Sequence, residues 1–546
     1  MGALCTTEGR LRCSLAVAVE ASEGHRWGKP TPAGGSVPAT GTPTGTPTET
    51  VDVLVIGAGI SGIGAGHYLT TRLPSKTFAI IEARSAAGGT WDLFRYPGIR
   101  SDSDLHTFGY EFKPWRDKQS IADAPRILSY LQQTIEENGL AEHIRYNHRV
   151  VSASWSSQES LWTVQIDRAD TGEHIAIKAN WIFAGSGYYR YDEGYTPYFE
   201  GRERFSGQII HPQHWPEDLD HTGKRVVVIG SGATAVTLLP AMAQTAEHVT
   251  MLQRTPSYIM PIPREDAIAN TFRRILGDER GYKWARRKNI AQQRLVYTFC
   301  QRFPKTARRA IRAVNQKFLP AGFPVDEHFN PPYDPWDQRL CAVPNGDLFK
   351  TIREGKTSIV TDRIATFTEN GILLESGREL EADIIITATG LNLQLLGGME
   401  LSVDGEPVNL PDHVIYRGLM LEGVPNAAMA IGYTNSSWTL KIGLLCEYLC
   451  DLISYMDAHG YSAVRAVADP GMETKPALDF QAGYVKRALA DLPRQGTDGP
   501  WTMSMNYYDD QRNLRKKDFA DENLRFSTEP ARSALAARAG AVAAGR

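Results

Sequence analysis

Cysteine is scarce in this sequence. Its 546 residues include only six cysteines, scattered between positions 5 and 450. So few thiols in so long a chain do not form a disulfide framework, which indicates a reducing compartment. Cys446 and Cys450 lie four residues apart and would share one face of a helix, but no further Cys or His ligand accompanies them, so we expect no bound metal.

An excess of charge of one sign is also missing, and so are long apolar runs. The formal net charge is −3, whereas a nucleic-acid-binding domain usually carries a basic excess. No segment approaches the roughly 18 to 20 uninterrupted apolar residues of a membrane-spanning helix, because even the apolar stretch 441–456 contains Glu447 and Asp451. We therefore expect a cytoplasmic protein with no nucleic-acid partner and no membrane-spanning helix.

The sequence does contain enough apolar material for a large core. Hydrophobic residues make up 42% and charged residues 22% of the chain, which is typical of soluble globular proteins and allows roughly two to four domains. The ends differ: residues 30–50 consist almost wholly of Thr, Pro, Gly, Ala and Ser, and residues 530–546 are rich in Ala and Arg. Such compositions cannot bury enough apolar surface to fold, so we predict disordered tails at 1–50 and 527–546.

A glycine-rich turn follows the first predicted strand. Residues 51–56 (VDVLVI) lead directly into this turn and then into a helical stretch that reaches residue 69. The turn contains Gly57, Gly59, Ser61 and Gly62. In such turns the first glycine permits the tight bend, the second admits a pyrophosphate, and the third lets the helix pack on the strand. A second strand, 78–81, ends at Glu82, whose carboxylate is placed to accept both hydroxyls of an adenosine ribose.

A second copy of this pattern begins at residue 225. The predicted strand 225–229 leads into a turn that contains Gly230, Ser231, Gly232, Ala233 and Thr234. After the next strand, 248–252, the acid of the first copy is missing, and the residues there are Gln253, Arg254 and Thr255. A carboxylate would repel the 2′-phosphate of NADPH, whereas a guanidinium binds it with paired hydrogen bonds. The first site therefore suits FAD and the second suits NADPH.

The two motifs predict an α/β fold with two Rossmann-like dinucleotide-binding domains. A further strand predicted at 383–387 leads into Ala388, Thr389 and Gly390, as expected where the chain returns to the first domain. We therefore predict that the NADPH domain is inserted in the FAD domain. The predicted boundaries are 51–204 and 385–526 for the two parts of the FAD domain and 205–384 for the NADPH domain.

A basic segment that is helical by its pattern interrupts the NADPH domain at about 267–320. It contains fourteen Lys or Arg residues between positions 273 and 317, against only Asp278 and Glu279. A solvated helical face explains such a segment most simply. The alternative is peripheral contact with an anionic membrane surface.

Two further motifs are more specific than the glycine turns. Residues 205–216 (FSGQIIHPQHWP) fit F-x-G-x-x-x-H-x-x-x-W-P, and GGTW at 88–91 is followed by YPGIRSD at 96–102. Both resemble fingerprints of the type I Baeyer–Villiger flavin monooxygenases. The resemblance extends over residues 51–526. Five strings make it similar to the subgroup of ethionamide-activating and long-chain-alkane flavin monooxygenases. They are GGTWDLFRYPGIRSDSD (88–104), HPQHWPEDLD (211–220), IGSGATAVTL (229–238), YDPWDQRL (333–340) and GYTNSSWTLK (432–441).

The resemblance implies which residues hold the cofactors and carry the reaction. It assigns the lining of the flavin to Thr90, Trp91, Asp92, Leu93, Arg100, Ser101 and Asp102. Val150 would contact the adenine through its backbone. Arg339 matches the active-site arginine of the family, and Asp102 matches the carboxylate that partners it. A permanent positive charge there stabilises an anionic peroxide and the adduct that it forms with a carbonyl.

The implied activity is a Baeyer–Villiger oxygenation that depends on FAD, NADPH and molecular oxygen. A ketone, by resemblance an aliphatic open-chain one, would be converted to an ester through a C4a-peroxyflavin. Two other oxygenations stay open: oxidation of sulfur or nitrogen, as in sulfides and thioamides, and hydroxylation of long-chain alkanes. A disulfide reductase with the same folds is not expected, because no cysteine occurs between Gly57 and Asp102.

One position departs from the family pattern. Relatives often carry Lys immediately before the active-site arginine, where it helps to bind the 2′-phosphate, but this chain has Gln338. The preference for NADPH over NADH should then depend mainly on Arg254. We expect His211 to link the two domains rather than to act as a base or as a metal ligand.

Overall fold

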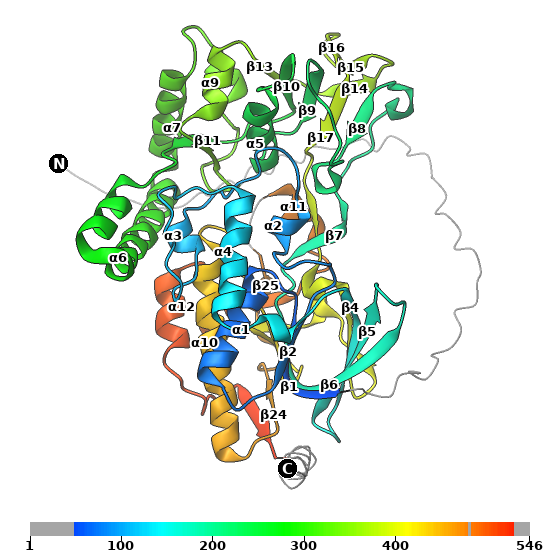
Figure 1. Cartoon of the computed structure of the whole chain (residues 1–546), viewed down its shortest axis with the longest axis vertical. Coiled ribbons are helices and arrows are strands. Elements are labelled where there is room, and N and C mark those ends of the chain that lie inside the picture. The colour runs from blue at the N-terminus through cyan, green and yellow to red at the C-terminus, as the bar shows by residue number, and fades with distance from the viewer. Residues whose placement is uncertain (1–48, 479–481, 529–546) are drawn as a thin grey trace, which may run out of the picture. The chain divides into compact units, whose positions relative to one another are not determined.

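The computed structural model describes residues 49–478 and 482–528 (Figure 1). The predicted tails, 1–50 and 527–546, lie almost wholly outside these described residues. Of the few residues of them that are described, three belong to strands, contrary to the prediction. Glu49 and Thr50 belong to the first strand and Ser527 to the last one. Hydrogen bonds to a neighbouring strand order these residues, although their own composition indicates no structure.

The larger of the two main sheets has nine strands in the order β20-β19-β4-β5-β6-β1-β2-β3, with β23 paired to β6. Strand β1 lies between β2 and β6 and is parallel to both. The strands are β1 (Glu49–Ile56), β2 (Phe78–Ile81), β3 (Ile144–Arg145), β4 (His148–Ser156), β5 (Leu161–Arg168), β6 (His174–Ala184), β19 (Glu400–Val403), β20 (Glu406–Pro407) and β23 (Ala427–Met429). The parallel centre of this sheet is the first of the two predicted dinucleotide-binding folds.

Both faces of β1 are covered. Val53 and Val55 pack into one core with the helices α1 (Ile60–Arg72), α4 (Ala124–Glu137) and α10 (Trp438–His459). Leu54 and Ile56 pack into a second core on the opposite face. A continuous apolar run without alternation is typical of a parallel strand buried on both faces.

The second main sheet has five parallel strands in the order β13-β10-β9-β17-β8. They are β8 (Gln208–Ile210), β9 (Arg225–Ile229), β10 (His248–Gln253), β13 (Thr357–Thr361) and β17 (Ile384–Thr387). Helices α5 (Ala233–Met242) and α9 (Asp347–Arg353) share a core with one face of this sheet. The other face packs on a small sheet of β14 (Ile364–Phe367), β15 (Gly371–Leu374) and β16 (Glu379–Glu381).

The strands of the second sheet lie in the chain between β6 and β19, so the second Rossmann-like fold is inserted in the first, as predicted. One predicted boundary falls within β17, because Ile385 and Thr387 pair with β9 in the second sheet. We therefore propose that the inserted domain ends at residue 387 rather than 384. The two connecting segments lie side by side, since β7 (Tyr189–Gly194) pairs with β18 (Leu391–Leu393).

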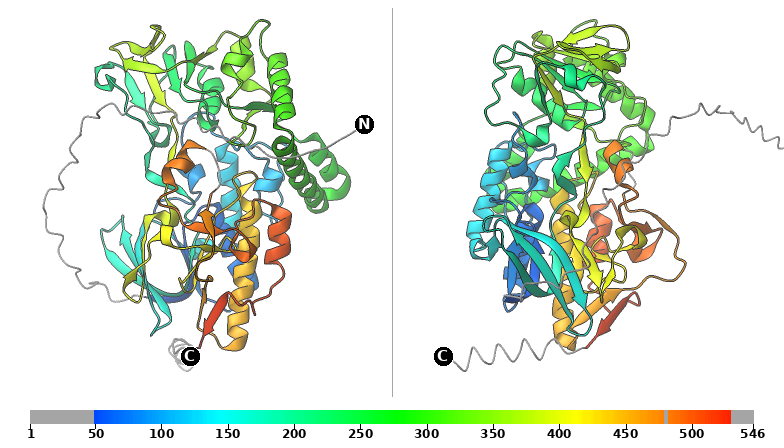
Figure 2. Two further views of the ribbon diagram at one scale, coloured as in Figure 1. Left: turned by 180° about the vertical axis from the view of Figure 1, so that it is seen from behind. Right: turned by 90° about the vertical axis from the view of Figure 1, so that its right-hand side faces the viewer.

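The basic segment forms α6 (Ala267–Arg302) and α7 (Pro304–Phe318), drawn in green at the edge of the described chain (Figure 2). The remaining helices are α2 (Thr90–Leu93), α3 (Leu105–Phe108), α8 (Val325–His328), α11 (Gly483–Ala488) and α12 (Tyr507–Leu514). The remaining strands pair two by two: β11 (Ile259–Ile262) with β12 (Cys341–Pro344), β21 (Ile415–Tyr416) with β22 (Met420–Leu421), β24 (Ala463–Ala466) with β27 (Leu524–Ser527), and β25 (Thr474–Pro476) with β26 (Arg494–Gly496). Within the described ranges, no helix has the length and apolarity to cross a bilayer.

Candidate active site

A cavity of about 640 Å³ lies between the two Rossmann-like folds and is lined by residues of both glycine-turn segments. Ligand pockets usually measure about 300–1,000 Å³. The predicted site residues that line it are Gly57, Gly59, Ser61, Glu82, Thr90, Trp91, Arg100, Ser101, Asp102, Val150, Ala233, Thr234 and Arg339. The structure thus brings together residues that are widely separated in the sequence.

The two glycine turns have the same backbone geometry. Gly59 precedes α1 and Gly232 precedes α5, and each has φ −80° and ψ −173°. No described side chain caps the N-terminus of either helix. The first backbone N–H groups of both helices are therefore free to bind an anion, and the helix dipole favours a negative charge there.

The sequence predicts a separate role for each glycine of the first turn, and the packing distances agree. A Cβ atom on Gly62 would lie 1.8 Å from the carbonyl oxygen of Gly57, so only glycine allows α1 to approach β1 this closely. Gly57 has φ +99°, a conformation that side chains rarely adopt. A Cβ on Gly232 would meet nothing within 4 Å. Gly232, the second glycine of its turn, thus borders open space, as a phosphate-binding turn requires.

Glu82 lies at the end of β2, where it is buried and lines the cavity. Its Oε2 accepts a hydrogen bond from the backbone of Ala58 at 2.7 Å, and its Oε1 accepts one from the backbone of Arg84 at 2.9 Å. Burial raises the pKa of Glu82, against the opposing effect of these two hydrogen bonds. Because each carboxylate oxygen has a second lone pair, both can still accept a ribose hydroxyl.

Two residues that were predicted to line the flavin do not reach the cavity. The carboxylate of Asp92 forms ion pairs with Arg84 at 2.6 Å and with Arg95 at 2.7 Å. Leu93 packs against the core of the second fold. Successive residues of the short helix α2 point in different directions, so Thr90 and Trp91 line the cavity while Asp92 and Leu93 face away from it.

The predicted catalytic pair is present in the cavity wall. Arg339 Nη1 donates to Asp102 Oδ2 at 3.3 Å, and Nη2 donates to the hydroxyl of Tyr188 at 3.4 Å. Arg339 Nε is buried and has no hydrogen-bond partner in the described part of the chain. Burial by itself would lower the pKa of Arg339, but the phenolic groups of Tyr188, Tyr484 and Tyr189, together with Asp102, raise it well above its ordinary value. The guanidinium therefore stays charged.

The residues predicted for NADPH differ in where their side chains lie. Ala233 and Thr234 line the cavity. Arg254 is exposed, and its side chain has no hydrogen bond or ion pair with any described residue. Ser231 Oγ donates to the carbonyl oxygen of Thr255 at 3.0 Å and thereby braces the turn. Among the residues predicted for NADPH, Arg254 is thus the cation whose charge no described residue pairs.

The side chain of Gln253 does not face the cavity, although Gln253 was predicted to bind NADPH. Its side chain is buried, and its Nε2 donates to the carbonyl oxygen of His328 at 2.9 Å and to the hydroxyl of Thr361 at 2.8 Å. These bonds connect β10 to α8 and β13, so the side chain supports the fold rather than facing the cavity. Its place at the end of a buried strand explains why the side chain points inward.

Comparison with known proteins identifies the family. The profile of the family described as flavin-binding monooxygenase-like matches residues 111–397, and that of an NAD(P)-binding Rossmann-like domain matches residues 55–117. The FAD-containing monooxygenase EthA of Mycobacterium tuberculosis is 52% identical over 487 residues, which cover 89% of this chain and 99% of that protein. The chain belongs to the flavin-binding monooxygenase-like family. It is therefore a flavin-dependent monooxygenase, in agreement with the predicted cofactors FAD and NADPH.

Other comparisons support the same conclusion. The probable FAD-binding monooxygenase AlmA of an Acinetobacter species is 49% identical over 479 residues, covering 87% of this chain and 96% of that protein. Among solved structures, a steroid monooxygenase bound to NADP matches with a TM-score of 0.68 at 24% identity, and an open form of cyclohexanone monooxygenase with 0.68 at 22%. Both matches cover 88% of this chain and 100% of the other. They show that the flavin-binding monooxygenase shares their fold.

Apart from Trp91, the sequence predictions missed the aromatic residues of this flavin-binding monooxygenase's cavity. Tyr188 stacks on Trp438 with 5.0 Å between ring centroids, and Trp438 Nε1 donates to Ser61 Oγ at 2.9 Å. Tyr433 and Phe108 also line the cavity. The string 432–441, which contains Tyr433 and Trp438, was the available signal, but its resemblance alone assigned no role to either residue.

His211 lies outside the cavity lining, between the segments that connect the two sheets. Its Nε2 is 3.2 Å from the carbonyl oxygen of Gly390, and its Nδ1 accepts from the backbone of Gln213 at 3.2 Å. A Cβ on Gly194 in β7 would lie 2.0 Å from the imidazole ring. His211 therefore packs on both connecting segments, which favours the predicted linking role over a role as a base.

Proposed function

We propose that this chain is a Baeyer–Villiger monooxygenase that converts aliphatic, open-chain ketones to esters with NADPH and molecular oxygen. The observation that carries this proposal is the ion pair of Arg339 with Asp102 at 3.3 Å, in the wall of a cavity that both glycine turns also line. A fixed cation at this place can stabilise the negative charge that develops on oxygen when a carbonyl carbon is attacked.

The cofactors would be held from two sides of the cavity. The free N–H groups at the start of α1 suit the pyrophosphate of FAD, and Glu82 suits its ribose. The start of α5 suits the pyrophosphate of NADPH, and the exposed Arg254 suits its 2′-phosphate. When bound and reduced, the flavin supplies the activated oxygen for the reaction.

Arg339 would act on the substrate carbonyl. Negative charge develops on a ketone oxygen when its carbon is attacked, and a preorganised guanidinium stabilises that charge in a water-poor pocket. Asp102 and Tyr188 hold the guanidinium in place from two sides. The rings of Trp438 and Phe108 in the wall exclude water and contact the alkyl parts of an apolar substrate.

The decisive experiment identifies products by mass. Purified enzyme with NADPH would be given 2-alkanones of graded chain length, a cyclic ketone, an alkyl sulfide and an alkane. We expect esters from the open-chain ketones. A sulfoxide or an alcohol as the sole product would instead favour one of the other two oxygenations and overturn the proposal.

The Arg339→Ala variant tests the assigned role. We expect flavin reduction by NADPH to continue while ester formation falls roughly a hundredfold to a thousandfold. Unchanged ester formation would contradict the assignment. Arg378→Ala is a suitable control, because Arg378 is an exposed arginine outside the cavity lining.

A further inference from the structure

Large apolar side chains are exposed mainly on one segment of the chain. Eleven such side chains are exposed among the described residues, and eight of them lie between positions 268 and 303. These eight are Ile268, Ile275, Leu276, Trp284, Leu295, Val296, Phe299 and Phe303. A concentration of apolar side chains on the surface usually marks an interaction site.

The segment folds as a helical hairpin. Gly277 in α6 has φ 76° and ψ 170°, so it divides the helix into two arms, 267–276 and 278–302. A Cβ on Gly281 would lie 2.6 Å from the Cα of Arg273, so the arms pack closely beside the bend. Ile275 at the bend is 69% exposed. The tip of the hairpin thus presents apolar side chains to the surroundings.

The second arm continues the apolar surface. Leu295 and Phe299 are four residues apart and share one face of the helix, and the rings of Phe299 and Phe303 lie 5.8 Å apart between centroids. Trp284 precedes Leu295 by about three helical turns and lies on the same side. We call the residues Ile275, Leu276, Trp284, Leu295, Phe299 and Phe303 the hairpin face.

Cations surround the hairpin face. Exposed basic side chains of α6 that form no ion pair or hydrogen bond with the described residues are Arg274, Arg280, Lys283, Arg287 and Arg302. The guanidinium of Arg287 lies 5.7 Å from the ring centroid of Trp284. The two acids of the segment are already paired, Asp278 with Arg273 at 3.3 Å and Glu279 with Arg116 at 3.7 Å. The surface therefore complements a negatively charged partner.

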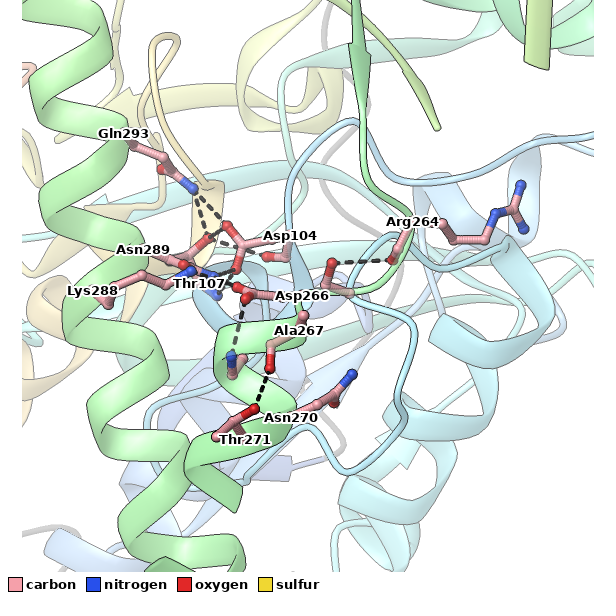
Figure 3. A network of polar contacts seen from close by, with 12 residues as sticks. Asp104, Thr107, Arg264, Asp266, Ala267, Asn270, Thr271, Lys288, Asn289 and Gln293 are labelled. Atoms are coloured by element: carbon pink, nitrogen blue, oxygen red, sulfur yellow. Dashed lines mark hydrogen bonds and ion pairs between the residues drawn. The ribbon is translucent and has the colours of Figure 1, made fainter. Parts of the chain in front are cut away.

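The opposite side of the second arm is fixed to the rest of the chain. Figure 3 shows polar side chains of α6 converging on Asp104, whose carboxylate accepts from Asn289 at 2.7 Å and from Gln293 at 2.8 Å. Lys288 donates to Asp266 at 2.6 Å in the same network. These bonds hold the arm so that the hairpin face stays outward.

The same arm adjoins the cavity. Ser436 lines the cavity and donates to Gln293 of α6 at 2.6 Å. The buried Arg286 donates to the backbone carbonyl oxygens of His106 at 3.0 Å and of Gly109 at 2.8 Å, in and after α3. A partner of the hairpin face would therefore lie near the substrate site.

We propose that the hairpin face docks on the surface of an anionic lipid bilayer. Exposed apolar side chains flanked by unpaired Arg and Lys are the combination that binds a membrane interface, where the rings enter the headgroup region and the cations meet anionic lipids. A second copy of this chain fits less well, because each copy would bring the same positive charge to the contact.

The test is flotation of the FAD-loaded full chain with vesicles. We expect binding to vesicles of phosphatidylcholine mixed with phosphatidylglycerol, much weaker binding to phosphatidylcholine alone, and a decrease of binding at high salt. Failure to bind the anionic vesicles, or equal binding to both kinds, would overturn the proposal.

Two sets of variants locate the surface. Combining Ile275→Ser with Trp284→Ser, or Arg280→Gln with Lys283→Gln and Arg287→Gln, should each weaken vesicle binding roughly a hundredfold. The matched controls are Tyr198→Ser, at a tyrosine that is 88% exposed elsewhere, and Arg378→Gln, at an exposed arginine outside the hairpin. Controls that lose binding equally, or hairpin variants that keep it, would contradict the assignment.

Further measurements separate the possible outcomes. Circular dichroism and FAD content show whether each variant is folded, and light scattering shows its oligomeric state. If the hairpin variants change a dimer to a monomer but bind vesicles as before, the face joins two copies and the proposal is wrong. NADPH oxidation without vesicles tests the proposed oxygenase separately, because no residue of the hairpin face lines the cavity.

Discussion

The guanidinium of Arg339 lies 3.3 Å from the carboxylate of Asp102, although 237 positions separate the two residues. Asp102 belongs to the segment between α2 and α3 that follows the first glycine turn, whereas Arg339 directly precedes β12 in the inserted fold. Their contact therefore joins the two Rossmann-like folds across the cavity. Any change that separates the folds also separates the pair.

Replacing Asp102 by Asn tests the positioning role of the carboxylate. The amide keeps the shape and an acceptor oxygen but removes the negative charge, so Arg339 should lose its preferred orientation. We expect ester formation to fall on the order of tenfold to a hundredfold, while stopped-flow flavin reduction by NADPH changes little. Asp102→Glu should restore part of the activity, and a variant as active as the parent chain would rule out this role.

The glycines of the two turns predict a matched pair of variants. Gly62→Ala places a methyl group 1.8 Å from a carbonyl oxygen and should lower the free energy of unfolding by at least about 1–3 kcal/mol, with loss of bound FAD. Gly232→Ala meets no atom within 4 Å, so the chain should stay folded with weaker NADPH binding. Thermal unfolding and flavin content distinguish the two, and equal destabilisation by both would be inconsistent with the packing described.

Arg254 should decide between NADPH and NADH. Its side chain is exposed and unpaired among the described residues, so removing it costs the fold little. We expect Arg254→Ala to raise KM for NADPH roughly tenfold to a hundredfold and to change KM for NADH little. An equal effect on both cofactors would refute the assignment.

A substitution at Gln338 should have the opposite effect and strengthen NADPH binding. Gln338→Lys places a second cation immediately before Arg339, where relatives often carry one. We expect it to lower KM for NADPH without a matching change for NADH. Steady-state kinetics with both cofactors measure the ratio, and a ratio that stays the same would indicate that this position does not face the 2′-phosphate.

His106 should make stability depend on pH. The ring is fully buried, and neither nitrogen has a hydrogen-bond partner among the described residues. Burial lowers the pKa of His106 below 6.5, although Asp104 and Asp266 oppose this effect. Lys288 and Arg273 lower it further. Because the unfolded chain binds this proton more readily, the stabilising contribution is complete above pH 6.5 and is lost as the pH falls below it.

A His106→Phe variant measures this contribution. Chemical unfolding across the acidic range should show a smaller loss of stability for the variant, by at most about 1.4 kcal/mol per pH unit. At about pH 8 the imidazole is neutral, so the two proteins should differ in free energy of unfolding only through packing. Parallel pH profiles would show that His106 does not titrate in this way.

The sequence allowed the two Rossmann-like folds to be predicted because their signals are local. Strand, glycine turn and helix are adjacent in the chain at 51–69 and again from 225, and backbone stereochemistry decides the turn without help from distant residues. The insertion could also be predicted, since β17 repeats the buried-strand pattern. We propose an end three residues later than predicted, because the pairing of β17 with β9 was not visible in the sequence.

The direction of individual side chains was less predictable. Asp92 and Gln253 belong to predicted site segments, but their polar groups are bound elsewhere, Asp92 by two arginines and Gln253 by His328 and Thr361. A resemblance assigns a segment to a site, while packing decides which of its side chains face the ligand. The same reason explains why Tyr188 and Trp438 were missed as neighbours in the cavity wall.

The sequence by itself thus determined the fold class, the two cofactor motifs and the family, because each depends on neighbouring residues and on long matching strings. The resemblance implied that Asp102 partners Arg339, but only the tertiary structure placed the two groups 3.3 Å apart and left one face of α6 uncovered. Both depend on how segments hundreds of positions apart pack together. Helical periodicity defines a face, but only the surrounding chain decides whether that face is buried.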